Sequence, residues 1–238
     1  MKEQILPPVR TSHVWQGARG RWCYDMWGRN GRPVVLLPAV LFDRTIWWPL
    51  AAELRPYAAV IAVDLPGHGG NGGPRPRHTT PGDLIDDLAG LIYHLGIRRA
   101  PVIVGHASTA GVATLFTTRY ATHAVIIVDA DGLSAPVATC PEQYLAALRL
   151  DDIPADFRPL AQPNDDPELF TAYQSCLSLP AAPAPGAVTA ALAVHSGPAP
   201  VCSGAAGRCW QHRAYDRPGR FAQLSEVHRL ASDIRALL

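Results

Sequence analysis

A glycine-flanked stretch, VGHASTAG at residues 104–111, has the spacing of a site for covalent catalysis. It follows the apolar run APVIV and precedes a helix-like segment, where the pattern Gly-x-Ser-x-Gly would expose a serine nucleophile on a tight turn. The middle position here holds Ala107, whose methyl group can neither attack a carbonyl nor donate a proton. The stretch therefore predicts the geometry of a nucleophile without its chemistry.

The register of this stretch has one alternative. If Ser108 were the nucleophile, His106 would stand where the tight turn needs a small side chain, so we favour Ala107 at that position. Serine and threonine are preferred at helix N-termini. We therefore interpret Ser108 and Thr109 as residues that serve the following helix.

The segments that must position this stretch alternate between strand and helix patterns. Continuous apolar runs at AAVIAVD, PVIVGH and HAVIIVD predict parallel strands that are covered on both faces. Helices are expected at WWPLAAEL, at TTPGDLIDDLAGLIYHLG with Thr80 as its cap, and at TAGVATLFTTRYA. RWCYDMWG and PVVLLP, separated by RNGR, are expected to form a hairpin that leads into the sheet. The fold class is α/β, with a mostly parallel sheet and helices on both faces.

Residues 134–187 interrupt this alternation. They are rich in proline and aspartate and contain one helix-like stretch, PEQYLAALRL, so we interpret them as a short cap or lid over the site. The chain then returns to strands at ALAVHSG and CWQHRAY and closes with the amphipathic helix SEVHRLASDIRALL. A length of 238 residues fits one α/β domain more readily than two, so we expect a single domain over residues 1–238.

Four motifs, in order along nearly the whole chain, resemble the α/β-hydrolase superfamily. VVLLPAVLFDRTIWWPLAAEL looks like the strand and oxyanion loop of that family, with Pro38-Ala39 in place of the usual His-Gly. AVIAVDLPGHGGN is similar to the next strand and its D-x-P-G-x-G turn, VGHASTAG to the nucleophile elbow, and RFAQLSEVHRLASDIRALL to the last loop and helix. The resemblance implies the α/β-hydrolase fold with a degenerate Ser-His-Asp triad. It says less about function, because one fold carries many chemistries.

The resemblance also locates the other two triad positions, and neither is kept. The family's closing loop usually reads Gly-His-Phe, whereas this chain has Arg220 in the middle, which stays protonated and cannot act as a general base. The acid usually follows ALAVHSG, but residues 198–200 are Pro-Ala-Pro. Some members place the acid one strand earlier, where VDADG offers Asp129 and Asp131; Asp131 is our candidate for a surviving acid, with a turn cap as the alternative. The histidines near these motifs, His68, His106 and His195, are interpreted as structural.

The oxyanion hole is the device that the resemblance leaves intact. Its donors in this family are backbone N–H groups, one after the nucleophile and one in the loop after an early strand, here Ser108 and Val40. Backbone donors survive side-chain substitution, so a carbonyl could still be polarised in an apolar pocket. We predict catalytic roles for Val40, Ala107, Ser108, Asp131 and Arg220, and substrate contacts from Leu41, Phe42, Trp47 and the lid residue Tyr144.

Composition and charge exclude several function classes. The chain has 21 basic and 20 acidic residues, a formal net charge of +1 and no block of like charges, so we expect no nucleic-acid and no membrane partner. No signal peptide and no apolar run of about 18 residues is visible, which predicts a soluble, cytoplasmic protein. Five scattered cysteines without C-x-x-C spacing disfavour a disulfide framework and a zinc site. We expect neither a cofactor nor a metal.

Three functions remain open. The favoured one is a non-hydrolytic cyclase, isomerase or lyase acting on a hydrophobic carbonyl compound, because orientation alone can lower the barrier of a ring closure by about 7 kcal/mol or more. Abundant Ala, Pro, Arg and Gly are typical of GC-rich bacterial genomes, which often carry such enzymes in secondary metabolism. The second is an esterase, thioesterase or lactonase whose serine was replaced by Ala107 through engineering. The third is a non-catalytic ligand-binding protein on the same fold, with Arg220 binding an acidic ligand.

Overall fold

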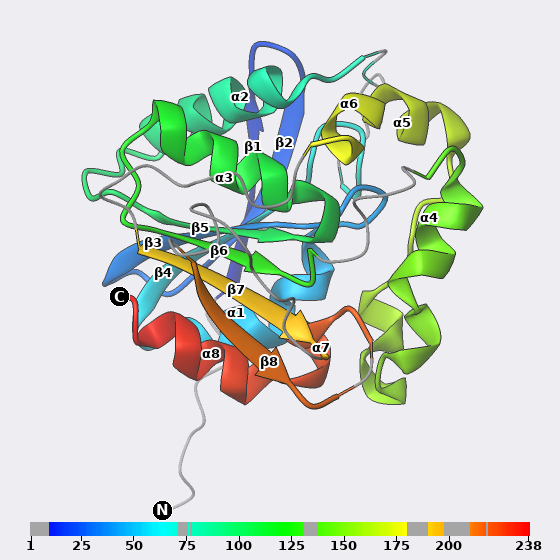
Figure 1. Cartoon of the computed structure of the whole chain (residues 1–238). Coiled ribbons are helices and arrows are strands. Elements are labelled where there is room, and N and C mark those ends of the chain that lie inside the picture. Colours follow the sequence, from blue (N-terminus) through cyan, green and yellow to red (C-terminus); the bar gives the residue numbers. More distant parts are fainter. Residues whose placement is uncertain are drawn as a thin grey trace, which may run out of the picture.

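The computed structural model describes residues 10–70, 76, 78–130, 138–179, 190–197, 210–217 and 219–238. Its sheet has the strand order β1-β2-β4-β3-β5-β6-β7-β8 (Figure 1). The pairs β1–β2 and β2–β4 are antiparallel, and the remaining neighbours are parallel. The predicted mostly parallel α/β sheet is confirmed. The strands are β1 (Arg10–Gln16), β2 (Arg21–Trp27), β3 (Arg32–Leu37), β4 (Ala58–Val63), β5 (Val102–His106), β6 (Ala124–Val128), β7 (Ala190–Ser196) and β8 (Gln211–Tyr215).

Helices cover both faces of this sheet. Figure 1 shows α2 (Pro81–His94) and α3 (Ala110–Arg119) on one face, and α1 (Trp48–Leu54) and α8 (Val227–Arg235) on the other. Helix α2 begins as predicted, because the Thr80 side chain accepts from the N–H of Asp83 while the Asp83 side chain accepts from that of Thr80. None of the helices in the described ranges is both long enough and apolar enough to span a bilayer.

The predicted hairpin between RWCYDMWG and PVVLLP is wrong. Strand β2 pairs with β1 and β4, and β3 lies between β4 and β5. The apolar residues of β3 are almost completely buried, so this strand takes an interior place in the sheet, where parallel neighbours cover it. The hairpin partner of β2 is the polar, exposed edge strand β1, which the apolar pattern did not reveal.

The cap contains more helical structure than the sequence predicted. Helix α4 (Pro141–Leu148) was expected, but η3 (Leu150–Asp152), η4 (Ala155–Leu160), α5 (Pro167–Ala172) and α6 (Gln174–Leu177) follow it. Figure 1 shows α4, α5 and α6 at the edge toward which the central strands point. The N–H of Asn164 donates to the carbonyl of Leu41 (2.7 Å), so the cap is attached to the loop after β3. The predicted cap boundaries at 134 and 187 lie outside the described residues.

A buried ion cluster fixes the start of η1 (Arg44–Trp47), which follows that loop. The Arg44 guanidinium lies 3.1 Å from Asp25 and contacts Asp64, and both carboxylates are fully buried. Asp64 also accepts from the N–H groups of Arg44 (2.8 Å) and Gly70 (2.9 Å). The loop at residues 38–43 is therefore held between β3 and a rigid anchor.

Candidate active site

Strained backbone gathers at the carboxyl edge of the sheet. In the described part of the chain, four residues other than glycine have positive φ: Leu41 (71°), Ala107 (48°), Asp129 (52°) and Arg149 (55°). The first three follow β3, β5 and β6, and the fourth ends helix α4 of the cap. Such conformations cost free energy and concentrate at functional sites, so this edge is the candidate active site.

The turn after β5 has the geometry of a nucleophile elbow. Ala107, and not Ser108, holds the left-handed conformation between β5 and η2 (Ala107–Thr109). A Cβ atom on Gly105 would lie 2.6 Å from the Thr109 carbonyl oxygen, so the strand can approach the helix this closely only with glycine at that position. The Thr109 hydroxyl accepts from the N–H of His106 (3.1 Å), and thereby serves the turn. The structure thus places alanine where the nucleophile would stand.

The Ser108 hydroxyl has a different role from the predicted helix cap. Its Oγ accepts a hydrogen bond from the Val40 N–H (2.9 Å) and shares a second with the Tyr144 hydroxyl (2.7 Å). The structure therefore brings together three of the predicted site residues, one from each of β3's loop, the elbow and the cap. The capping interpretation of Ser108 is wrong, because a tertiary donor 68 residues away engages this hydroxyl.

The loop that would carry the catalytic histidine is tied to the elbow by its backbone. His106 donates from Nε2 to the Arg220 carbonyl oxygen (2.7 Å). Burial lowers the pKa of His106 to about 4, so the ring is neutral near pH 7. A side chain that the sequence analysis interpreted as structural thus connects the two halves of the site.

The Arg220 side chain is half-buried and has no hydrogen-bonded or ion-paired partner among the residues that the structure describes. Burial lowers the pKa of its guanidinium, the nearby Asp129 raises it, and Arg149 lowers it again. The cap carboxylate of Asp152 lies 2.7 Å from Arg149 Nε. Within the described ranges, the Arg220 cation thus lies beside the elbow loop without a direct ion pair, and its charge interacts with that of Asp129.

The acid that joins the strand ends is Asp129. Its carboxylate accepts from the Ser196 N–H (2.6 Å), the Ser196 hydroxyl (3.0 Å) and the Ala222 N–H (2.9 Å). Burial raises the pKa of Asp129, although these hydrogen bonds and the charge of Arg220 lower it. Asp129 therefore links the ends of β6 and β7 to helix α7 (Ala222–Ser225). Our predicted acid, Asp131, lies outside the described residues.

The predicted substrate-contact residues surround the elbow as buried side chains. Phe42 packs edge-on against Phe221 (centroids 5.3 Å apart), and Trp47 lies 6.1 Å from the His106 ring. Tyr144 contacts Phe170 of the cap (5.8 Å). Leu41 donates its N–H to His68 Nε2 (2.9 Å), which holds the strained loop in place.

Several buried polar atoms in this region lack a partner within the described ranges. They are the Trp47 indole nitrogen, His106 Nδ1 and both polar atoms of the Gln223 amide. Helix α7, which carries Gln223, packs against η1, which carries Trp47. Orphan polar atoms are uncommon in protein interiors and need a bound water or ligand. Gln223 was not among the predicted site residues, and its position three residues after Arg220 is the signal in the sequence that points to it.

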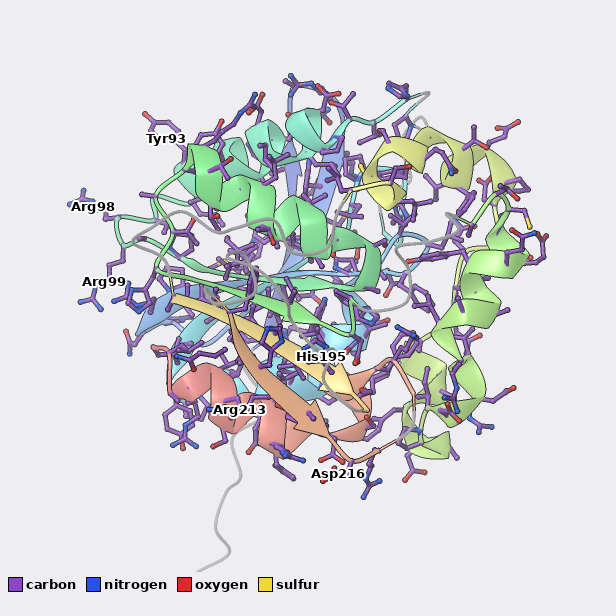
Figure 2. All side chains as sticks on the ribbon, in the orientation of Figure 1. Tyr93, Arg98, Arg99, His195, Arg213 and Asp216 are labelled. Carbon is purple, nitrogen blue, oxygen red and sulfur yellow. The ribbon has the colours of Figure 1, made fainter. Side chains whose placement is uncertain are left out.

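The third histidine interpreted as structural, His195, is engaged by a neighbouring strand. His195 on β7 forms a 2.9 Å hydrogen bond between its Nε2 and His212 Nδ1 on β8, and the two rings stack (Figure 2 labels His195). Burial and the neighbouring His212 lower the pKa of His195 to about 4. Among the described residues, no group of three or more His, Cys, Asp or Glu side chains is placed to hold a metal ion.

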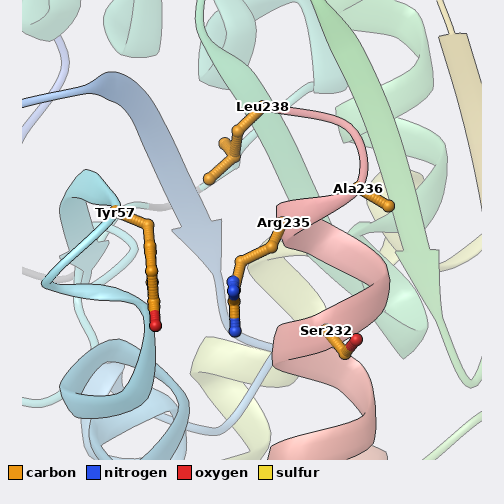
Figure 3. A pocket seen from close by; sticks show the side chains of 5 residues that line it. All are labelled: Tyr57, Ser232, Arg235, Ala236 and Leu238. Carbon is orange, nitrogen blue, oxygen red and sulfur yellow. The ribbon is translucent and has the colours of Figure 1, made fainter.

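A surface hollow of about 480 Å³ lies at the opposite end of the strands (Figure 3). Tyr57 immediately precedes β4, and the Arg235 guanidinium covers its ring at 3.8 Å. The hollow is lined by Tyr57 and by residues of the last helix and the C-terminus, so the elbow does not contribute to it.

Solved structures share this fold. An esterase from Thermogutta terrifontis with bound malate is 19% identical with a TM-score of 0.73, covering 95% of this chain and 97% of that one. The bottromycin epimerase BotH in complex with bottromycin A2 is 18% identical with a TM-score of 0.73 (95% and 99% covered). An AqdC variant with its substrate, described as cleaving the ring of the Pseudomonas quinolone signal, is 15% identical with a TM-score of 0.70 (96% and 98%).

Sequence comparison gives a family but no individual relative. No curated protein matches the chain. A profile described as "Alpha/beta hydrolase family" matches residues 34–234, from β3 into the last helix. This span includes the elbow, the cap and the closing loop, and it contains the strands from β3 to β8. The chain is therefore a member of the alpha/beta hydrolase family.

Proposed function

We propose that this protein is a non-hydrolytic enzyme that binds an apolar carbonyl-containing small molecule and catalyses its cyclisation, isomerisation or elimination. The observation that carries the proposal is Ala107 at the strained elbow position. Keeping a left-handed alanine preserves the geometry of the site, yet the methyl group removes acyl transfer through this residue.

The surroundings of the elbow support the same reading. The N–H of the neutral His106 ring is committed to the Arg220 carbonyl, and Arg220 cannot accept a proton. The Arg220 guanidinium, for which the described part of the chain supplies no hydrogen-bond or ion-pair partner, is suited to hold a carboxylate, an enolate or a carbonyl oxygen. Preorganised donors of this kind stabilise charge that develops in a transition state.

The similar folds include enzymes of different reaction types. One is an esterase, one is described as cleaving the ring of the Pseudomonas quinolone signal, and one is the bottromycin epimerase, in complex with bottromycin A2. A bacterial natural product with an apolar carbonyl group is therefore the substrate class that we infer. Positioning such a molecule supplies much of the rate enhancement that an intramolecular reaction needs.

Isotope labelling separates this proposal from hydrolysis. The protein is incubated with a panel of lactones, aryl ketones and β-dicarbonyl compounds in H₂¹⁸O, and the products are analysed by mass spectrometry. We expect products isomeric with the substrate or formed by elimination, without ¹⁸O at a new carboxyl group. An ¹⁸O-labelled acid would indicate a hydrolase, and ligand binding without any product would favour the non-catalytic alternative. A serine codon at position 107 of the gene would identify an engineered hydrolase.

A further inference from the structure

The hydroxyl groups of Ser108 and Tyr144 are hydrogen-bonded to each other, and one of their two O–H protons has no acceptor among the described residues. The two oxygens share a single hydrogen bond of 2.7 Å, and Ser108 Oγ also accepts from the Val40 N–H at 2.9 Å. Whichever hydroxyl donates within the pair, the other keeps a free O–H. No acceptor for that proton lies in the described ranges, so it is available to a ligand.

Ser108 is the member of the pair that offers this proton. Its exposed fraction is 8%, whereas that of Tyr144 is 2%. Burial raises the pKa of the Tyr144 phenol well above its ordinary value, so it remains a donor. A phenol is a stronger donor than an aliphatic hydroxyl, so Tyr144 donates to Ser108 and Ser108 retains its own O–H.

The same contacts engage the backbone N–H that would usually donate to a bound carbonyl. In this fold the N–H at the position of Val40 would itself contact the ligand oxygen. Here that N–H donates to Ser108 Oγ instead. The Ser108 oxygen accepts hydrogen bonds from both the Val40 N–H and the Tyr144 O–H. These two bonds make the Ser108 O–H a stronger donor, because hydrogen bonds in a chain strengthen one another.

We propose that the Ser108 O–H, and not the Val40 N–H, donates the hydrogen bond to the carbonyl oxygen of the ligand, with Tyr144 as the positioning residue that orients Ser108. The ligand class, an apolar carbonyl compound, rests on the function proposed above. The Val40 amide then acts through Ser108. The rotation of this side chain decides where the carbonyl is held.

Infrared spectroscopy of acetophenone with a ¹³C-labelled carbonyl tests this arrangement. In the unaltered protein we expect the bound carbonyl to absorb at a lower frequency than in hexane. Ser108→Ala should remove the part of this shift that the hydroxyl supplies, while the backbone N–H of residue 108 remains, and should weaken binding about tenfold, the effect of losing one hydrogen bond. Tyr144→Phe should keep part of the shift, because Val40 still orients Ser108. Tyr173→Phe is the matched control: this cap tyrosine is equally buried, but its hydroxyl donates to the Pro66 carbonyl (2.7 Å).

The variant Ser108→Ala also frees the Val40 N–H, which makes the test decisive. An equal or larger shift in Ser108→Ala would mean that Val40 donates directly, and would overturn the proposal. Failure of acetophenone to bind at millimolar concentration would also overturn it. Ser108→Cys, similar in size but a weaker donor, should give a reduced shift with an unchanged melting temperature, and guards against a folding defect. A Ser108-dependent shift without turnover in the ¹⁸O experiment would contradict the enzymatic function alone.

Discussion

The Nε2 nitrogen of His106 lies 2.7 Å from the backbone carbonyl oxygen of Arg220, so the residue before the elbow holds the loop in which a catalytic histidine would stand. The imidazole nearest to Ala107 in sequence is thereby fixed as a donor. Its remaining nitrogen, Nδ1, is buried without a partner among the described residues. The site therefore has a histidine beside the elbow that positions backbone instead of accepting the proton of a serine.

Restoring a hydroxyl at the elbow should not restore hydrolysis. We expect Ala107→Ser to show no turnover of p-nitrophenyl esters and no labelling by a fluorophosphonate probe, because in the described residues the histidine next to the elbow, His106, is neutral and donates to the Arg220 carbonyl. The unaltered protein should behave in the same way, since Ser108 Oγ contacts an amide and a phenol and not an imidazole. Labelling at Ser108, or efficient hydrolysis by the variant, would show that a functional triad exists.

Glycine at the elbow should stabilise the protein. The left-handed conformation of Ala107 costs free energy that glycine would not lose, although glycine also has more conformational entropy in the unfolded chain. We expect Ala107→Gly to raise the free energy of unfolding by about 0.5 kcal/mol in urea titrations. Ala110→Gly, in the first turn of α3, is the control and should lower it by roughly 0.5–1 kcal/mol. Destabilisation by both would argue against strain at Ala107.

Removing the Arg220 charge should weaken the binding of anionic ligands. With benzoate as the probe in calorimetric titrations, we expect Arg220→Ala to lose roughly 1.5–3 kcal/mol of binding free energy. Arg220→Lys should recover only part, because an ammonium cannot reproduce the planar fork. Arg217→Ala is the matched control, since Arg217 is 63% exposed and pairs with Glu226. Equal affinities in all four proteins would place the ligand away from Arg220.

Asp129→Asn should destabilise the fold. The carboxylate accepts three hydrogen bonds. In asparagine, the side-chain NH₂ group would face the N–H or O–H of Ser196 or the N–H of Ala222 and could not accept from them. Unsatisfied buried donors cost free energy, so we expect unfolding to become easier by roughly 2–4 kcal/mol. Asp216→Asn, at a side chain that is 98% exposed, should change it by less than about 0.5 kcal/mol. A stable Asp129→Asn variant would mean that this junction is not anchored by the charge.

His106 should make stability depend on pH. Burial lowers its pKa from 6.5 to about 4, so between these values the unfolded state binds more protons than the folded state. The contribution of the neutral ring is thus present above pH 6.5 and is lost as the pH falls toward 4. His106→Phe has no titrating ring at this position. The loss of unfolding free energy that the substitution causes should therefore be smaller at pH 5 than at pH 7.5 by about 2 kcal/mol. An identical difference at both pH values would mean that the ring protonates freely in the folded state.

Local patterns in the sequence determined the central fold. The apolar runs that became β4, β5 and β6 are buried on both faces of the sheet, and burial of this kind is visible as continuous hydrophobicity. Thr80 was identified as a cap because its partner Asp83 is only three residues away. The elbow register followed from the need for glycine at position 105, where strand and helix meet closely.

Contacts between distant segments decided the rest, because no local pattern encodes them. The sequence could not show that β1 instead of β3 would pair with β2, since an edge strand is exposed and lacks an apolar signature. It placed Ser108 in the helix, whereas the structure turns its hydroxyl toward Val40 and Tyr144, 68 and 36 residues away. It offered both Asp129 and Asp131 as acids, and the structure shows that Asp129 joins three segments of the chain, whereas Asp131 lies outside the described residues. A side chain's hydrogen-bond partner is set by which donors folding brings within about 3 Å, and only the tertiary structure specifies that.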